Sequence, residues 1–240
     1  ISEPIADFFD AVVIGDGEQI VLKMTDILLK CKENGIKDKE KILYKWSKLT
    51  GVYIPCFFKP KYKKFGKKTF QSLVTQYSDY KTISRAIIPS LENAQFPTAP
   101  VLAYGKPVHD RLRLEVTRGC TRGCRFCQAG IIYRPIRERS VKNLTNIYKK
   151  AILSTGYEDV SLLSLSIGDY SCLTPLVEQL IQLNELQQVA ISLPSLRAGT
   201  LSSNLMKLIK KVRKTGFTIA PEAGSQRLRD VINKNITQTQ

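Results

Sequence analysis

The sequence predicts an α/β protein whose second half contains a parallel sheet, and three observations support this prediction. From residue 111 onward, short apolar stretches alternate with longer stretches in which apolar residues recur every three or four positions. Alternating strands and helices are typical of parallel strands joined by helical crossovers. The strand candidates are almost continuously apolar, as from Val160 to Leu165, which indicates a sheet covered by helices. With 43% hydrophobic residues among 240, the chain can also build a substantial core.

The first fifty residues contain one strand, a turn and a helix. Ala11–Ile14 has the pattern of a buried strand, Gly15 to Glu18 forms a glycine-containing turn, and apolar residues recur at helical spacing from Ile20 to Leu29. Acidic residues at the start of this helix are favourable next to its dipole. A second, short helix is predicted around Leu43 and ends before Gly51.

Residues 51–110 are interrupted by prolines, which predicts a linker with short strands rather than long helices. Within it, the stretch Lys59–Lys68 carries six lysines together with Tyr62 and Phe65. Basic residues mixed with aromatic ones are able to bind RNA. Alternation around a glycine also describes a hairpin whose lysines face solvent. The hairpin is the favoured interpretation, and RNA binding is the alternative.

After residue 110 the elements follow one another regularly, as four units of strand and helix. The predicted strands are Leu112–Thr117, Val160–Ile167, Val189–Leu193 and Phe217–Pro221, and the predicted helices are Ser140–Ser154, Thr174–Leu186, Leu201–Thr215 and Ser225–Asn233. Reactive groups of parallel barrels gather on the loops at the carboxyl ends of the strands. We therefore expect the functional residues directly after each strand.

Composition limits the class of protein. The chain carries 37 basic and 21 acidic residues, a net charge of +16, which favours anionic partners without identifying one. No apolar run approaches the roughly 18 residues of a membrane span, and six cysteines without a signal-like segment argue against a disulfide framework. We therefore expect a soluble, cytoplasmic protein with no membrane partner. Because the chain begins at Ile1 and ends at Gln240 without a closing element, we also expect a piece of a longer protein.

Three cysteines follow the first strand of the second half, in the pattern C-x3-C-x2-C. Thiolates such as those of Cys120, Cys124 and Cys127 are the ligands that iron–sulfur clusters prefer. Three close ligands with no nearby fourth leave one iron of a four-iron cluster open, and an open position distinguishes a reactive metal site from a structural one. Zinc bound by the same cysteines and His109 is the alternative, although structural zinc usually pairs two short ligand motifs.

The other cysteines, Cys31, Cys56 and Cys172, are isolated in the sequence and are predicted to be small buried residues.

The cysteine motif, with Phe126 just before its last cysteine, resembles the cluster-binding loop of the radical S-adenosylmethionine (radical SAM) superfamily. The stretch from His109 to Ser140 is similar to the branch that carries a cobalamin-binding domain and is related to the methylthiotransferases. The resemblance implies that residues 111–240 are a truncated radical SAM core, a partial (β/α) barrel with about four of its six βα units. Residues 1–50 would then be the last βα unit of a Rossmann-like, cobalamin-binding-like domain, and residues 51–110 the linker. Cobalamin itself is not supported, because the only histidine, His109, lies at the wrong end.

The resemblance also implies an activity. In the superfamily, a 4Fe-4S cluster delivers an electron to S-adenosylmethionine and yields a 5′-deoxyadenosyl radical, with a donor such as flavodoxin or ferredoxin supplying the electron. The substrate is not identified, and transfer of a methyl or methylthio group is the reaction that the branch favours. An RNA- or ribosome-associated protein with a structural cluster is the alternative.

By the same resemblance, further residues would contact S-adenosylmethionine. Phe126 would lie near the adenine, Gly168 and Asp169 would accept the ammonium group of the methionine moiety, Ser192 and Arg197 would face its ribose and carboxylate, and Glu222 stands where methylthiotransferases carry a glutamine. From the residues alone, an ordinary strand-to-helix turn at Gly168 and a surface position for Arg197 stay open.

Overall fold

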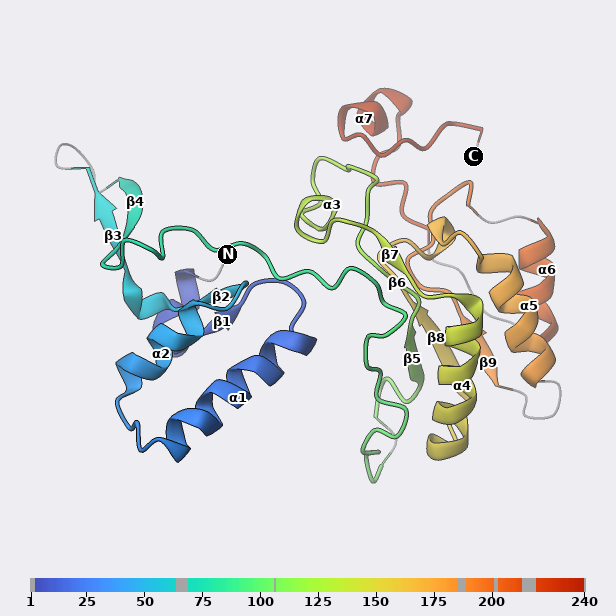
Figure 1. Ribbon diagram of the computed structural model, residues 1–240. Coiled ribbons are helices and arrows are strands. Elements are labelled where there is room, and N and C mark those ends of the chain that lie inside the picture. The colour runs from blue at the N-terminus through green and yellow to red at the C-terminus, as the bar shows by residue number, and fades with distance from the viewer. Residues whose placement is uncertain are drawn as a thin grey trace. The chain divides into compact units, whose positions relative to one another are not determined.

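The structure is a computed structural model that describes residues 3–63, 69–105, 107–184, 189–200, 203–212 and 219–239. The chain divides into two compact units, Ile1–Ile88 and Pro89–Gln240. Both are drawn in Figure 1. None of the helices in the described ranges combines the length and hydrophobicity that a membrane-spanning helix needs.

The first unit contains the predicted strand, turn and helix. Its elements are η1 (Glu3–Phe8), β1 (Val12–Val13), α1 (Glu18–Glu33), α2 (Lys39–Ser47), β2 (Val52–Tyr53), η2 (Pro55–Phe57), β3 (Phe58–Tyr62) and β4 (Phe70–Thr75). β1 pairs with β2 in antiparallel orientation. The indole nitrogen of Trp46 donates to the carbonyl of Met24 at 3.0 Å, which joins α2 to α1. The Tyr80 hydroxyl donates to the Val52 carbonyl at 2.7 Å and so fixes a buried core around β2.

The lysine-rich stretch forms the predicted hairpin as far as the structure describes it. β3 and β4 pair in antiparallel orientation, and residues 64–68 between them lie outside the described ranges. The side chains of Lys59 and Lys61 are exposed. Tyr62 pairs with Phe70 across the hairpin, with their rings 6.4 Å apart in an edge-on arrangement. The alternation of lysine and aromatic residues therefore separates two faces of one β-ribbon.

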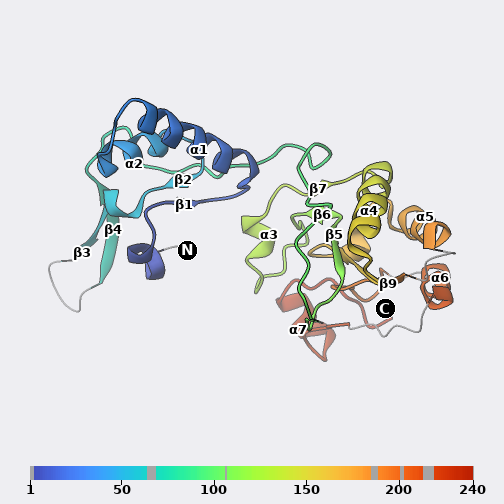
Figure 2. The same cartoon turned by 90° about the horizontal axis from the view of Figure 1, so that it is seen from below.

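The second unit is built around the predicted parallel sheet. Its strands β5 (Leu112–Glu115), β8 (Asp159–Leu163) and β9 (Ala190–Ser192) lie in the order β5-β8-β9, and all are parallel. The helices α4 (Val141–Thr155), α5 (Leu173–Asn184) and α6 (Ser203–Val212) lie along one side of this sheet, as Figures 1 and 2 show. Apolar side chains of strands and helices form one buried core, including Leu114, Val160, Leu162, Leu144 and Leu176.

Parts of three predicted elements, at residues 185–186, 201–202, 213–215 and 217–218, lie outside the described ranges. Of the predicted strand at residues 217–221, Ile219 forms an isolated parallel bridge with Leu196.

The ends of α4 follow from local chemistry. The Ser140 hydroxyl accepts a hydrogen bond from the Asn143 amide at 3.2 Å and caps the first turn. Gly156 ends the helix in the left-handed conformation (φ 68°), and its amide donates to the Ile152 carbonyl at 2.9 Å. A residue with a side chain is strained at this φ, so the glycine ends the helix at this position.

An antiparallel ribbon extends beyond the carboxyl end of β5. It consists of β6 (Thr117–Arg118) and β7 (Arg137–Glu138), with the short helix α3 (Ala129–Ile132) between them. Arg139 follows β7 and is only 1% exposed. Its guanidinium donates to the carbonyls of Leu91 and, at 3.2 Å, Ala94. This arginine therefore holds the start of the second unit against the ribbon.

Candidate functional site

The three cysteines lie on the loop of residues 119–136 that joins β6 to β7, which we call the cysteine loop. It begins at Gly119, whose φ is +101°. A Cβ atom at Gly119 would lie 2.6 Å from the carbonyl oxygen of Pro135 and closer still to that of Tyr133. Only glycine allows the two ends of the loop to approach in this way. The loop therefore leaves and re-enters the ribbon at a narrow neck.

The side chains of Cys120, Cys124 and Cys127 are free thiols of intermediate exposure. The Cys127 amide donates to the Cys124 carbonyl at 3.1 Å, which turns the chain tightly between these two thiols. Three accessible sulfur ligands on one short loop fit the chemistry of an iron–sulfur cluster. Within the described residues, no three His, Cys, Asp or Glu side chains form a ready-made group for a metal ion. We therefore expect cluster binding to draw the thiols together.

The alternative zinc ligand His109 lies elsewhere in the second unit. It is exposed and precedes the amino end of β5, whereas the cysteine loop follows the carboxyl end of that strand. His109 and the cysteine loop therefore follow from opposite ends of β5, His109 from its amino end and the loop from its carboxyl end.

The remaining cysteines differ among themselves. Cys31 is buried in α1, as predicted, but Cys56 and Cys172 are exposed, and that prediction was wrong. Cys56 lies in η2 between Pro55 and Phe57, whose side chains are buried, and so points to the opposite side of the turn. Burial of a cysteine in a turn depends on its neighbours in space and cannot be read from composition.

The loop after β8 contacts the cysteine loop through an ion pair. The Arg122 guanidinium donates from Nε to Asp169 Oδ2 at 2.7 Å and from Nη2 to the other oxygen, so both carboxylate oxygens are engaged. The side chain of Asp169 is 16% exposed and that of Arg122 is 40% exposed. Arg122 holds the pKa of Asp169 below its usual value, and the charge of Arg197 acts in the same direction. Asp169 is therefore a carboxylate between two arginines.

The loop after β9 brings Arg197 to the same end of the sheet. Arg197 is 9% exposed, and its Nη2 atom has no hydrogen-bond partner within the described residues. A buried donor without a partner is costly, because it has lost its water. Gly168 packs so closely on Thr200 that a Cβ atom there would collide with the threonine side chain. Ser192 is the last residue of β9 and is partly buried.

The segment around α7 (Gln226–Val231) closes over the cysteine loop. The side-chain amide of Asn233 donates to the Gly123 carbonyl at 2.8 Å, and the Arg125 amide donates to the Ile232 carbonyl at 3.0 Å. Lys234 lies 5.6 Å from the centre of the Phe126 ring. These contacts join the cysteine loop to the segment that follows α7.

Glu222 is bound to the same lysine. Its carboxylate lies 3.1 Å from Lys234 Nζ, and its φ of 68° is unusual for a residue with a side chain. A pocket of about 440 Å³ lies beside this segment and is lined by residues including Ala198, Pro221, Ser225 and Arg229. A cavity of this size is large enough for a small molecule.

Of the six residues predicted to contact S-adenosylmethionine, five fall into two groups, and Ser192 lies at the end of β9. Gly168, Asp169 and Arg197 lie together, Asp169 in ion-pair contact with the cysteine loop. Phe126 and Glu222 share the contact with Lys234.

Sequence reasoning missed Arg122 and Lys234. Arg122 lies between the first two cysteines, and its position inside the motif is the signal that could have identified it. The ammonium group of Lys234 carries no such signal, because its contacts depend on the path of the chain after α7.

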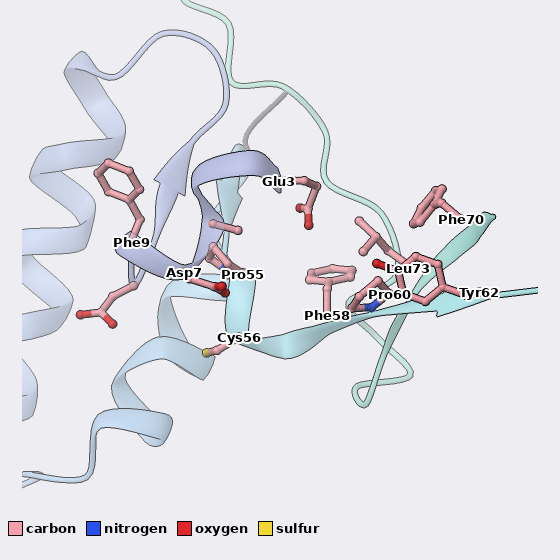
Figure 3. A pocket seen from close by; sticks show the side chains of 12 residues that line it. Glu3, Asp7, Phe9, Pro55, Cys56, Phe58, Pro60, Tyr62, Phe70 and Leu73 are labelled. Carbon is pink, nitrogen blue, oxygen red and sulfur yellow. The ribbon is translucent and has the colours of Figure 1, made fainter. Parts of the chain in front are cut away.

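The first unit has a pocket of its own, of about 470 Å³, between η1 and the hairpin (Figure 3). The aromatic rings of Phe58, Tyr62 and Phe70 and the carboxylates of Glu3 and Asp7 line it. No residue of the cysteine loop takes part in this pocket.

Three accessible thiols on one loop at the carboxyl end of a parallel sheet give this α/β protein the donor atoms that sulfur-ligated metals prefer. Comparison with known proteins agrees. The radical SAM superfamily matches residues 114–240, and the family described as "Radical SAM proteins, N-terminal" matches residues 1–55. An uncharacterised protein of Methanocaldococcus jannaschii is 33% identical over 235 residues, which cover 98% of this chain and 43% of that protein. The chain thus spans less than half the length of this relative.

The chain belongs to the radical SAM superfamily. Membership implies a 4Fe-4S cluster and S-adenosylmethionine, and Cys120, Cys124 and Cys127 have the C-x3-C-x2-C spacing of the superfamily's cluster ligands.

Proposed function

We propose that this chain carries the core of a radical SAM enzyme that cleaves S-adenosylmethionine reductively and uses the resulting 5′-deoxyadenosyl radical on a further substrate. One observation carries the proposal: three accessible thiols lie on a loop whose neck and flanks are held in place at the carboxyl end of the sheet. A cluster bound there supplies the electron that breaks the sulfonium C–S bond. We further propose that residues 111–240 form part of a (β/α) barrel and that flavodoxin or ferredoxin supplies the electron.

In this proposal the chain's own residues bind the amino acid end of S-adenosylmethionine. Arg197 presents a buried Nη2 donor that has no partner among the residues the structure describes, and such a donor suits a carboxylate. Asp169 presents an ionised carboxylate, which suits an ammonium group, although Arg122 already engages both of its oxygens. A ligand ammonium would therefore share Asp169 with Arg122. Phe126 is 55% exposed and would offer its ring to the adenine.

The branch related to methylthiotransferases, which the stretch from His109 to Ser140 resembles, supports transfer of a methyl or methylthio group as the overall reaction. Glu222 would then approach the ligand from the segment before α7, where it is now held by Lys234. The RNA-binding alternative is not favoured by the family matches, which concern the radical SAM regions of the chain.

Production of 5′-deoxyadenosine tests the proposal. The full-length protein, purified without oxygen and reconstituted with iron and sulfide, should bind about four iron atoms per chain. With S-adenosylmethionine and a chemical reductant it should then release 5′-deoxyadenosine. A protein in which Cys124 is replaced by serine is the control and should release none. Loaded protein that binds S-adenosylmethionine but never cleaves it would contradict the proposal.

A further inference from the structure

Arg122 is the only residue between the first two cysteines whose side chain reaches another loop, within the part of the chain that the structure describes. Its partner Asp169 is 47 residues away and follows β8. The pair uses two parallel N–H···O bonds, an arrangement that fixes direction as well as distance. Of the contacts that hold the cysteine loop, this one alone joins it to a residue that the proposed function places at the ligand.

Arg122 also carries a positive charge within the cysteine motif. In the sequence Arg122 stands two residues after Cys120 and two before Cys124, and its guanidinium donates two hydrogen bonds to Asp169. The positive charge that the cysteine loop carries between its first two thiols is thus bound to a carboxylate from outside the loop. The more closely Asp169 holds this positive charge, the less of it acts on the two sulfurs.

We propose, on the basis of the proposed function, that Arg122 is a positioning residue that anchors the cysteine loop on Asp169 and sets the positive charge that Cys120 and Cys124 experience. The reduction potential of an iron–sulfur cluster depends on the net charge and hydrogen bonds around it. The two members of the pair therefore act on a bound cluster with opposite sign. Arg122 makes the cluster easier to reduce, and Asp169 offsets that effect.

Substitutions on the two sides of the pair test the proposal. Arg122→Gln removes the positive charge and should lower the reduction potential of the reconstituted cluster. Asp169→Asn leaves Arg122 without its counter-charge and should raise the potential. Arg122→Lys keeps the charge but loses the two-bond geometry, so the potential should stay near that of the unchanged protein. Lys149→Gln removes an equal charge from an exposed position on α4 and is the control.

Amide hydrogen exchange in the metal-free protein measures the anchor separately. Arg122→Gln and Asp169→Asn should each speed exchange in the cysteine loop about tenfold, since each removes the same charge-assisted bonds. The exchange rate of the loop in Arg122→Lys should lie between the rates of these two variants and that of the unchanged protein. The double variant should exchange no faster than either single variant, because one interaction is lost in all three.

Two results would overturn the proposal. Unchanged exchange in Arg122→Gln would show that the pair does not anchor the loop. Potentials that shift in the same direction for Arg122→Gln and Asp169→Asn would show a general disturbance rather than a balance of charges. The proposed function fails differently, by absence of iron uptake or of 5′-deoxyadenosine in the unchanged protein, and the exchange measurement still decides the anchor in that case.

Discussion

The cysteine loop and the β3–β4 hairpin are both glycine-containing, basic segments with aromatic residues. The cysteine loop joins the two strands of an antiparallel ribbon, and the described part of the hairpin is such a ribbon itself. They differ in how they are held. Arg122 and Gly123 of the cysteine loop bond to Asp169 and Asn233, which come from distant parts of the chain. At the base of the hairpin, Phe58 packs against Tyr53 and Tyr80. Beyond it, the described part of the hairpin is organised by its own pairing and by the edge-on contact of Tyr62 with Phe70.

The difference shows what separates a chemical site from a charged surface. A loop that is proposed to present three ligands to one group needs contacts that fix its shape. For the cysteine loop these contacts come from Asp169, after β8, and from Asn233, after α7. A solvent-facing ribbon needs only alternation of polar and apolar residues.

The largest effect is expected at the cysteines. Replacing Cys120, Cys124 or Cys127 by serine should lower the iron content of the reconstituted protein at least about tenfold, because each change removes a thiolate ligand. Iron analysis and the visible absorption of the cluster measure this loss. Cys172→Ser is the matched control, since Cys172 is exposed and isolated in the sequence, and it should keep its iron. Equal loss in the control would contradict a cluster on the cysteine loop.

The neck of the loop should be the next most sensitive position. Gly119→Ala places a methyl group against the carbonyls of Tyr133 and Pro135 at a φ of +101°. We expect a loss of about 3 kcal/mol in the free energy of unfolding of the second unit, from strain and collision together.

Gly156→Ala is the control for this change. Gly156 also has a positive φ, of +68°, but nothing lies within 4 Å of an added Cβ atom. Its cost should be about 1 kcal/mol, from backbone conformation alone. Urea unfolding of both variants separates collision from conformation, and equal losses would mean that the neck is not tightly closed.

The contrast also explains which features could be predicted from the sequence. The spacing of Cys120, Cys124 and Cys127 is local, so the metal-binding motif was visible without a structure. The helix α4 was predicted closely because its cap, Ser140, is part of the local pattern. By contrast, Asn233 donates a hydrogen bond to Gly123, which is 110 residues away, and the periodicity of the sequence does not predict such a long-range contact.

Wrong or incomplete interpretations have the same origin. Cys56 and Cys172 were expected to be buried, but the packing of neighbouring residues exposes them. The role of Asp169 in accepting a ligand's ammonium group stays a prediction, but its ion pair with Arg122 was not foreseen. In each case the deciding neighbour is distant in sequence or lies on the other side of a turn.

A smaller effect should distinguish two ion pairs under acid conditions. Arg122 lowers the pKa of the partly buried Asp169, and Lys48 lowers that of the exposed Asp79 in the first unit. A carboxyl whose pKa is lower in the folded state adds stability above its unfolded pKa, near 4, and this stability is lost as the pH falls through the folded pKa. Asp169→Asn should therefore make the cysteine loop less sensitive to acid.

Asp79→Asn is the comparison, because its pair is open to solvent and screened by salt. We expect no measurable change in the acid unfolding of the first unit, which the fluorescence of the only tryptophan, Trp46, follows. Amide exchange from about pH 3 to about pH 6, a range that includes the ordinary carboxyl pKa, follows the second unit. If Asp79→Asn reduced acid sensitivity as much as Asp169→Asn does, the exposed ion pair would stabilise its unit as much as the partly buried pair.

The smallest effect is expected at the hairpin. Lys59 and Lys61 are exposed, and replacing both by glutamine should change the free energy of unfolding by less than about 0.5 kcal/mol each. Iron content and 5′-deoxyadenosine release should be unchanged, because neither lysine belongs to the cysteine loop. The same variant tests the RNA alternative, with a short single-stranded RNA as the probe. If this RNA binds the unchanged protein, and if the variant binds it more weakly and with a smaller salt dependence, the ribbon is a nucleic-acid-binding surface. Unchanged RNA binding would leave the lysines as a solvated face, and the contrast between the two ribbons would stand.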